Sequence, residues 1–388
     1  MKNFIIIILL IILLNSIINS CAKKEEPTKP NLQKTPITIL SSKLAAGWSH
    51  SMVIKTNGAL WVAGNNGNGQ LGTGDYEQRS TWTNITSIEK SNAIASGAYH
   101  SIKTMPDGTL WVTGNNGYGQ LGIGQDIEKY TWTHVTEITN VSAVATDYLH
   151  SLLITSDRTL WVTGFNNFGQ LGLGNNIDIN TWTQVTGMAN VSAISAGYYH
   201  SLALKTDGTL WVTGNNTYGQ LGLGDNVNRD TWTQVQGMTD VSVISSGWNH
   251  SLLIKTDGTL WVTGFNANFQ LGLGDDIDRN TWTQVTEMAN IAAIEAGVYH
   301  SLALKKDGTL WVVGRNNEGQ LGLGEDIKQK STWTQVTGLA NICAISAGYY
   351  YSLALETNGT LWVTGDNGNY QLGLGDTMQR NTWTQVSE

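Results

Sequence analysis

Six histidines recur at a spacing of 50 residues, and such a ring of equivalent imidazoles could in principle bind a metal ion. The set comprises His50, His100, His150, His200, His250 and His300, with Tyr351 at the seventh position. Metal binding needs several imidazole nitrogens about 2 Å from one ion, whereas packed sheets lie about 10 Å apart. We therefore expect no metal here. Each histidine is instead predicted to form a hydrogen bond to backbone between neighbouring structural units.

A serine follows each of these seven residues, which raises the possibility of a nucleophile next to its base. Adjacent residues in a strand point to opposite faces of the sheet, so a histidine and the serine after it cannot form a proton relay. No copy of the motif adds an Asp/His/Ser cluster that the other copies lack. We expect no catalytic residue and no enzyme activity.

Acidic loops such as LGLGDDIDRN (271–280) faintly resemble calcium-binding loops. They lack the alternating carboxylates and the terminal bidentate glutamate of a hand-type calcium site. Gly-Asp pairs are also typical of turns. We expect these segments to be turns, without calcium or any other cofactor.

The elements that must position these residues are seven copies of one unit of about 50 residues. An LW pair and a TWT tripeptide recur in register in every copy, and the copies fill residues 38–388. Each copy holds four strand-like runs, as at 191–196, 200–206, 209–214 and 231–235. The pattern predicts an all-β fold, a seven-bladed β-propeller with four-stranded blades.

Two connections in each unit carry further predictions. Asp207-Gly208 predicts a two-residue hairpin turn between the second and third runs. Asp157-Arg158 stands at the same place in the third copy, where arginine should be strained by a positive φ. If the long connection between the third and fourth runs crosses between blades, residues 382–386 complete the first blade and close the ring.

The stretch GYYHSLALKTDGTLWVTGNNTYGQLGLG (197–224) resembles the repeat of the regulator of chromosome condensation family, whose members form seven-bladed propellers. The resemblance covers residues 38–388 and recurs seven times. It implies the fold far more than an activity, because members include nucleotide exchange factors for a nuclear GTPase, a plant ultraviolet-B photoreceptor and a secreted bacterial β-lactamase inhibitor.

This sequence differs from two of these members in the residues on which their activities depend. The exchange factors insert a β-wedge beyond the repeats, and here no insertion exceeds one residue, so an exchange factor-like regulator of a small GTPase is the less favoured function. GWSHS (47–51) and GWNHS (247–251) resemble the GWRHT motifs of the photoreceptor but lack their arginine.

The N-terminus resembles that of an exported bacterial lipoprotein. Residues 1–20 have the charged start and apolar run of a signal peptide. Ile18 to Cys21 resembles a lipobox, which implies lipidation of Cys21. Residues 21–37 are charged and proline-containing, as in a flexible tether. We expect a lipid-anchored protein on the surface of the cell envelope, or a secreted one if the signal is cut elsewhere. Cys343 is left without a disulfide partner and is expected to be a small buried residue.

The copies differ mainly in two short segments, which are the two residues before each His and the residue after the third run. Both are rich in aromatic residues, and hairpin pairing brings both to the end of the blade opposite the Asp-Gly turns. Seven blades would gather these side chains on one face. The predicted partner-binding residues are Trp48, Tyr99, Tyr148, Phe165, Tyr198, Tyr199, Trp248, Phe265, Tyr299, Arg315, Tyr349 and Tyr350.

Aromatic residues contribute much of the binding energy at protein interfaces. We therefore expect a monomeric propeller that binds a protein partner through this face. A carbohydrate-binding lectin or an enzyme that uses the same face is the alternative. The net charge of −8 and the lack of a basic stripe argue against a nucleic-acid partner.

Overall fold

The computed structural model describes residues 43–86 and 90–387. The chain divides into two units, Met1–Thr35 and Pro36–Glu388. The predicted signal peptide (1–20), Cys21 and the tether (21–37) lie outside the described residues. Within the described part, no helix is both long and apolar enough to span a bilayer.

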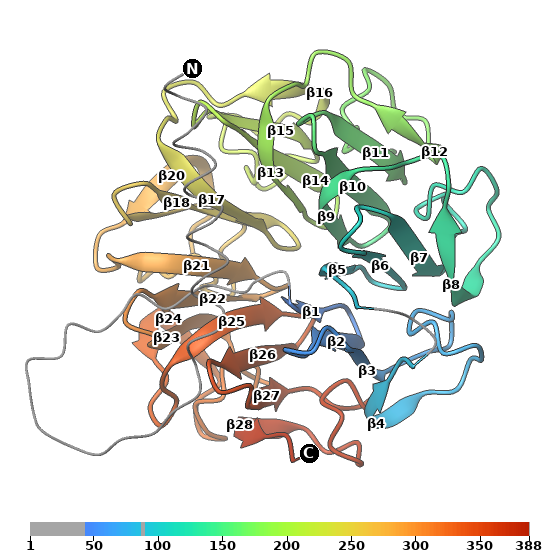
Figure 1. Cartoon of the computed structure of the whole chain (residues 1–388). Helices are drawn as coiled ribbons and strands as arrows, with labels where there is room; N and C mark the ends of the chain where they lie inside the picture. The colour runs from blue at the N-terminus through green and yellow to red at the C-terminus, as the bar shows by residue number, and fades with distance from the viewer. Residues whose placement is uncertain (1–42, 87–89, 388) are drawn as a thin grey trace, which may run out of the picture. The chain divides into compact units, whose positions relative to one another are not determined.

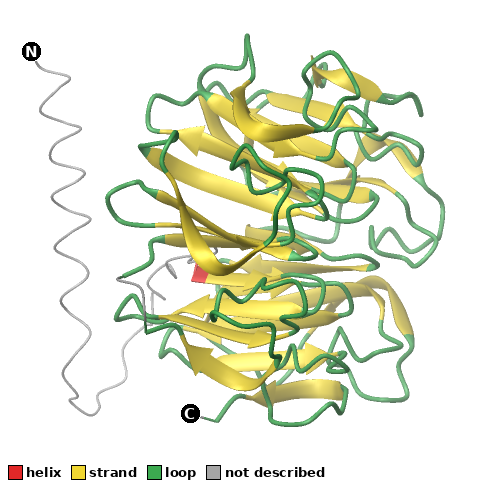
Figure 2. Cartoon of the chain, turned by 90° about the vertical axis from the view of Figure 1, so that its right-hand side faces the viewer, coloured by secondary structure: helices red, strands yellow, loops and turns green. Residues whose placement is uncertain are grey.

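The described strands form seven antiparallel sheets of four strands, and each sheet is built from four consecutive strands (Figure 1). This confirms the predicted all-β seven-bladed propeller. Strands and connecting loops account for nearly all of the described backbone (Figure 2). In chain order the strands are β1 (Leu44–Ala46), β2 (His50–Ile54), β3 (Leu60–Gly64), β4 (Arg79–Asn84), β5 (Ala93–Ser96), β6 (His100–Thr104), β7 (Leu110–Gly114), β8 (Lys129–Val135), β9 (Val141–Asp147), β10 (His150–Thr155), β11 (Leu160–Gly164), β12 (Ile179–Gln184), β13 (Val191–Ala196), β14 (His200–Lys205), β15 (Leu210–Gly214), β16 (Arg229–Gln234), β17 (Val241–Ser246), β18 (His250–Lys255), β19 (Leu260–Gly264), β20 (Arg279–Val285), β21 (Ile291–Ala296), β22 (His300–Lys305), β23 (Leu310–Arg315), β24 (Gln329–Gln335), β25 (Ile342–Ala347), β26 (Tyr351–Glu356), β27 (Leu361–Gly365) and β28 (Arg380–Gln385).

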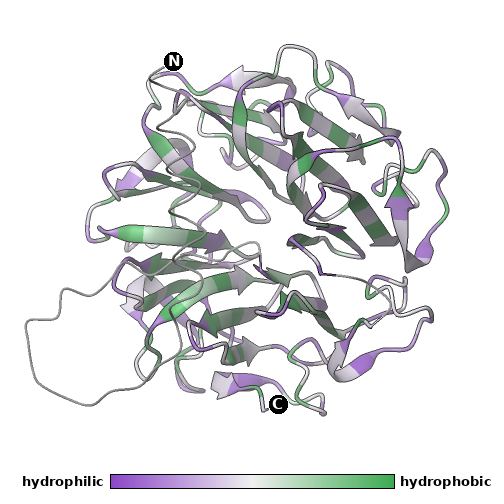
Figure 3. Cartoon of the chain, in the orientation of Figure 1, coloured by the Kyte–Doolittle hydropathy of each residue, from purple (hydrophilic) through white to green (hydrophobic). Residues whose placement is uncertain are grey.

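The hydrophobic core lies between neighbouring blades. The two middle strands of each blade are buried on both faces, so they read as nearly continuous apolar runs, and the hydrophobic colouring concentrates on them (Figure 3). Leu202, Leu204 and Val212 of the fourth blade pack with Leu253 and Trp282 of the fifth. As predicted, the free Cys343 is buried, and burial raises the pKa of its thiol to about 11.

The innermost strands close a ring. Strand β1 packs against both β5 and β25, and the other inner strands pack in sequence between them. The expected ring closure is wrong, because β28 pairs with β27 in the last blade and not with the first blade. The long connection joins the third and fourth strands of the same blade, so residues 382–386 belong to the seventh blade.

Contacts between adjacent blades join the ring instead, and an equivalent β-bridge is present at each of the seven junctions. The long connection of one blade forms a β-bridge to the outer strand of the next, as between Leu223 and Thr281. At the seam, which is the junction between the last and the first blade, Leu374 bridges to Thr81. Trp82 Nε1 donates to the Leu372 carbonyl over 3.2 Å. Gly373 makes this approach possible, since a Cβ there would lie 2.5 Å from the Trp82 ring.

The hairpin between the second and third strands has a three-residue loop and not the predicted two-residue turn. Leu204 pairs with Leu210, and the Gly208 amide donates to the Lys205 carbonyl. Gly208 has φ 80°, as in a type I turn followed by a left-handed residue. Arg158 takes that position in the third blade with φ 65°, so the expected backbone strain is present.

Candidate functional site: an aromatic face

The two variable segments of each blade lie side by side at the same end. The residue after the third strand donates its amide to the carbonyl of the residue before the His, as from Asn215 to Tyr199 over 2.8 Å and from Phe165 to Leu149 over 2.9 Å. The loop register differs by one residue from the predicted one, yet the two segments still meet. Antiparallel pairing brings them together whichever turn joins the strands.

The aromatic side chains form one contiguous group, which we call the aromatic face. Trp48 lies at its centre, with ring centroids 4.7 Å from Tyr349, 5.1 Å from Tyr148 and 5.4 Å from Tyr99. It also stacks on Tyr198 of the fourth blade at 6.1 Å. A residue of the first blade can reach the fourth only because the inner strands converge on the propeller axis.

The group extends around the ring through the remaining predicted residues. Trp248 contacts Tyr198 at 5.3 Å and Tyr299 at 5.0 Å, and Tyr299 stacks on Tyr350 at 6.0 Å. These side chains are half-buried, whereas Phe165 is buried. Each ring is therefore fixed by its neighbours and still presents an edge or a face to solvent, which suits a rigid binding surface.

Arg315 is the one charged member of the predicted set. Its guanidinium pairs with Glu318 at 2.5 Å and lies 5.1 Å from the Tyr350 ring and 5.7 Å from the Tyr299 ring. The carboxylate neutralises the charge, and the rings hold the planar group in place by cation–π attraction. Arg315 therefore contributes a flat, oriented surface to the aromatic face more than a free positive charge.

Two phenylalanines of the face stand where the scaffold needs an amide. In the fourth blade the buried Gln220 donates its Nε2 to Asn215 Oδ1 over 2.7 Å, and Gln70 donates likewise to Asn65. Phe165 and Phe265 replace that asparagine in the third and fifth blades. There the Nε2 atoms of Gln170 and Gln270 are buried and have no hydrogen-bond partner among the described residues.

An unsatisfied buried amide costs about 1–3 kcal/mol. Phe165 instead contacts Tyr118 at 5.2 Å and Tyr199 at 5.6 Å, and Phe265 contacts Tyr218 at 4.9 Å. Phe165 and Phe265 thus extend the aromatic face, and the glutamine hydrogen bond that the first and fourth blades form at this position is lost. Residues that break a local rule of the fold in this way are expected at functional sites.

A rim of exposed aliphatic side chains was missed by the sequence reasoning. It comprises Ile127, Ile177, Val227, Ile277 and Met378, which are between 57% and 68% exposed. They lie on the long connections that leave the same end of each blade as the aromatic face. Six of the seven copies carry Ile, Val or Met at this position of an otherwise polar loop, and that periodicity was the available signal.

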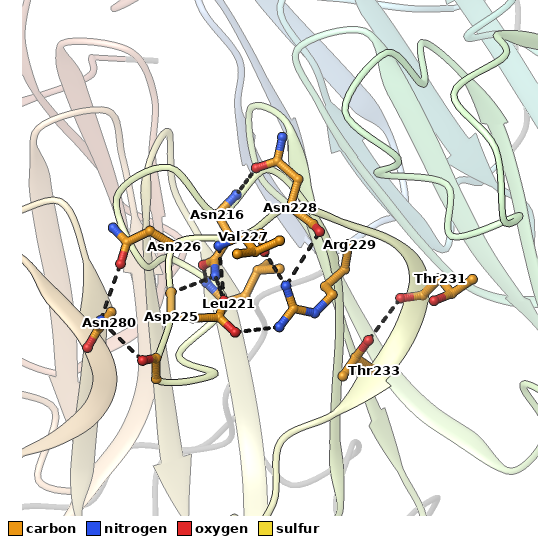
Figure 4. Close-up of polar contacts among 11 residues, drawn as sticks. Asn216, Leu221, Asp225, Asn226, Val227, Asn228, Arg229, Thr231, Thr233 and Asn280 are labelled. Carbon is orange, nitrogen blue, oxygen red and sulfur yellow. Dashed lines mark hydrogen bonds and ion pairs between the residues drawn. The ribbon is translucent and has the colours of Figure 1, made fainter.

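The acidic loops position this rim (Figure 4). Asp225 pairs with Arg229 at 2.6 Å and accepts the Val227 amide at 3.0 Å, while Asn216 donates to the Asp225 carbonyl at 2.8 Å. The hydrogen bond from Arg229 is the largest influence that lowers the pKa of Asp225. These carboxylates organise turns, and no group of three or more His, Cys, Asp or Glu among the described residues could hold a metal.

The six histidines connect blades, but to a side chain and not to backbone as predicted. His200 Nε2 lies 2.9 Å from Ser251 Oγ of the next blade, and the other five form the same pair. Ser251 Oγ donates to the Gln220 carbonyl, so it must accept from the imidazole, which then carries its proton on Nε2. At the seam, Tyr351 donates to the His50 carbonyl over 2.5 Å.

This hydrogen bond is not the one that a catalytic His-Ser pair needs. The serine hydroxyl accepts from the histidine, so the histidine cannot act as its base. Both groups are fully buried, and burial lowers the pKa of His200 to about 3. The six pairs are uncharged hydrogen-bonded contacts between blades.

Comparisons with known proteins identify the repeat. The family model described as RCC1-like domain matches residues 19–292. Models of the regulator of chromosome condensation (RCC1) repeat match residues 307–355, and 291–320 with 342–371. No curated protein sequence matches the chain.

Solved structures agree in fold. Yeast RCC1 (Prp20), solved bound to Kap60, superposes with a TM-score of 0.78 at 20% identity, over 95% of this chain and 91% of that one. Human WBSCR16 superposes with a TM-score of 0.77 at 20% identity, over 85% of this chain and 94% of that one. The chain belongs to the RCC1 repeat family.

Proposed function

We propose that this propeller binds a protein partner through the aromatic face and its aliphatic rim. The observation that carries the proposal is the placement of Phe165 and Phe265 at the expense of two buried glutamine amides. The half-buried aromatic group and the exposed aliphatic rim share one end of the blades, and large apolar surfaces of this kind mark protein–protein interfaces. Aromatic residues at the centre of such a surface supply most of the binding energy.

The N-terminal sequence supports a location for this activity. We propose that the protein is exported and anchored by lipid on Cys21, with residues 21–37 as the tether that lets the propeller face a partner at the membrane surface. Metabolic labelling with a fatty acid should tag the wild-type chain and not a Cys21→Ser variant. Equal labelling of both chains would contradict the anchor.

The binding proposal is tested by affinity capture with the full chain extracted from membranes. A Trp48→Ala/Trp248→Ala variant should lose the proteins that the wild type captures, because it removes the centre of the aromatic face. Lys306→Ala is the matched control, since Lys306 is exposed in the turn at the opposite end of its blade. Capture of the same proteins by all three chains would refute the proposal. Binding of the wild type to a glycan array, with no protein captured, would favour the carbohydrate-binding alternative.

A further inference from the structure

The inner strands of the seven blades converge around a common centre (Figure 1). They line a channel of about 660 Å³. Its wall runs from Asn92, Ser142 and Ser242 at one end to Trp48 and Trp248 at the other. The aromatic face therefore lies over one mouth of the channel, where Trp48 of the first blade contacts Tyr198 of the fourth. Four of the seven inner strands have six residues, and at about 3.3 Å per residue the channel is roughly 20 Å long.

Most of the wall is small or neutral, and two carboxylates stand out. Asp147 of β9 and Glu295 of β21 line the channel, and no Lys or Arg does so among the described residues. Neither acid forms an ion pair with a described residue. The other titratable groups in the wall are Tyr198 and Tyr349. Of the basic groups on the strands beside Asp147, Lys103 of β6 lies over the Trp111 and Trp132 rings, and the imidazole of His150 is paired with Ser201.

Each acid replaces a residue that the scaffold uses elsewhere. At the position of Glu295 three blades have serine, and Ser195 and Ser245 accept an amide of the next inner strand at 2.9 Å and 3.0 Å. At the position of Asp147 the other six blades have glycine. A Cβ at Gly197 would lie 2.4 Å from the His200 ring, so this position leaves no room for a side chain. In the third blade the inner strand instead extends to Asp147.

Further acceptors in the wall lack partners. The hydroxyls of Ser96, Thr146 and Ser246 line the channel and have no hydrogen-bond partner among the described residues, and Ser246 is only 7% exposed. Confinement in the channel raises the pKa of Asp147 to about 7 and that of Glu295 to about 8 by desolvation. A cation that entered the channel would favour the ionised forms of both.

We infer that the channel receives an arginine side chain of the protein partner, which enters between the rings of the aromatic face. The inference rests on the proposed function and names the chemistry of the partner. Aromatic rings at the mouth attract a guanidinium by cation–π interaction. Its five N–H donors match carboxylates and hydroxyls that are distributed over several blades.

The test uses the peptide acetyl-Ala-Arg-Ala-amide and its citrulline analogue, which has nearly the same shape without the charge. Calorimetry on the full chain should show at least about tenfold weaker binding of the citrulline peptide. Binding of the arginine peptide should release protons at pH 7 and tighten from pH 6 to pH 9, since the carboxyls ionise as the cation enters.

Two variants restore the residues that other blades use and should therefore fold. Glu295→Ser and Asp147→Gly should each weaken binding of the arginine peptide about tenfold and reduce the proton release. Equal affinity for both peptides, no binding at millimolar peptide, or unchanged affinity in both variants would overturn the inference. Capture that is lost only in the Trp48→Ala/Trp248→Ala variant, with no peptide binding, would leave the aromatic face as the binding site and refute the channel alone. Peptide binding without protein capture would refute the proposed function alone.

Discussion

Replacing Lys103 with leucine should stabilise the propeller, and most strongly below pH 7. Lys103 lies in β6 and is completely buried. The other six blades have Val, Leu or Ala at this position. The Nζ atom has no hydrogen-bond partner among the described residues and lies 4.7 Å from the Trp132 ring and 5.8 Å from the Trp111 ring.

The magnitude follows from linkage. Burial lowers the pKa of Lys103 from 10.5 to about 7, and each tenfold change in proton affinity is about 1.4 kcal/mol. The folded pKa lies below the unfolded one, so the unfolded chain binds more protons between pH 7 and pH 10.5. Stability therefore rises with pH across this window, and below pH 7 the full penalty of up to about 5 kcal/mol applies. The pKa of Lys103 is lowered even though the Trp111 and Trp132 rings lie beside the ammonium group.

Urea denaturation of the wild type and of Lys103→Leu at pH 6 and pH 9 tests this account. The variant should be more stable by several kcal/mol at pH 6 and by less at pH 9, because the wild type gains about 1.4 kcal/mol per pH unit in between. Lys205→Leu is the matched control, since Lys205 lies 4.2 Å from the Trp211 ring but is half-exposed. It should change stability little. Parallel pH profiles for wild type and Lys103→Leu, or a loss of stability at pH 6, would refute the reasoning.

Three further outcomes are expected. Arg158→Gly should raise the free energy of unfolding by about 1 kcal/mol, because glycine adopts the positive φ of that turn without strain; a decrease would show that the arginine side chain makes a stabilising contact. Phe165→Asn should weaken partner capture, and the hydrogen bond that it supplies to Gln170 should offset part of the stability lost with the buried ring; unchanged capture would remove Phe165 from the binding surface. Acid should unfold the protein steeply below pH 6.5, as followed by tryptophan fluorescence. The six buried histidines have a pKa near 3 in the folded state and about 6.5 in the unfolded state. The unfolded chain therefore binds more protons between these pH values, and the free energy of unfolding falls by up to about 8 kcal/mol for each pH unit. Constant stability from pH 6.5 to pH 4.5 would contradict this expectation.

Local and periodic features could be predicted from the sequence alone. The 50-residue period fixed the number of blades, because each copy is one four-stranded unit that must bury its faces against the next. The position of Arg158 indicated a positive φ, since the other copies place glycine there. The grouping of Trp48 and Trp248 with the variable tyrosines followed from antiparallel pairing, which does not depend on the turn.

Contacts between blades were decided only by the tertiary structure. His200 pairs with Ser251, a residue 51 positions away, and no pattern within one copy indicates that bond. Ring closure depended on which blade the last strand joins, and both answers fit the same period. The channel acids show the same limit, because Asp147 and Glu295 look like single exceptions in separate copies. Only closure of the ring places them in one cavity, since packing of the inner strands around a common axis depends on all seven blades at once.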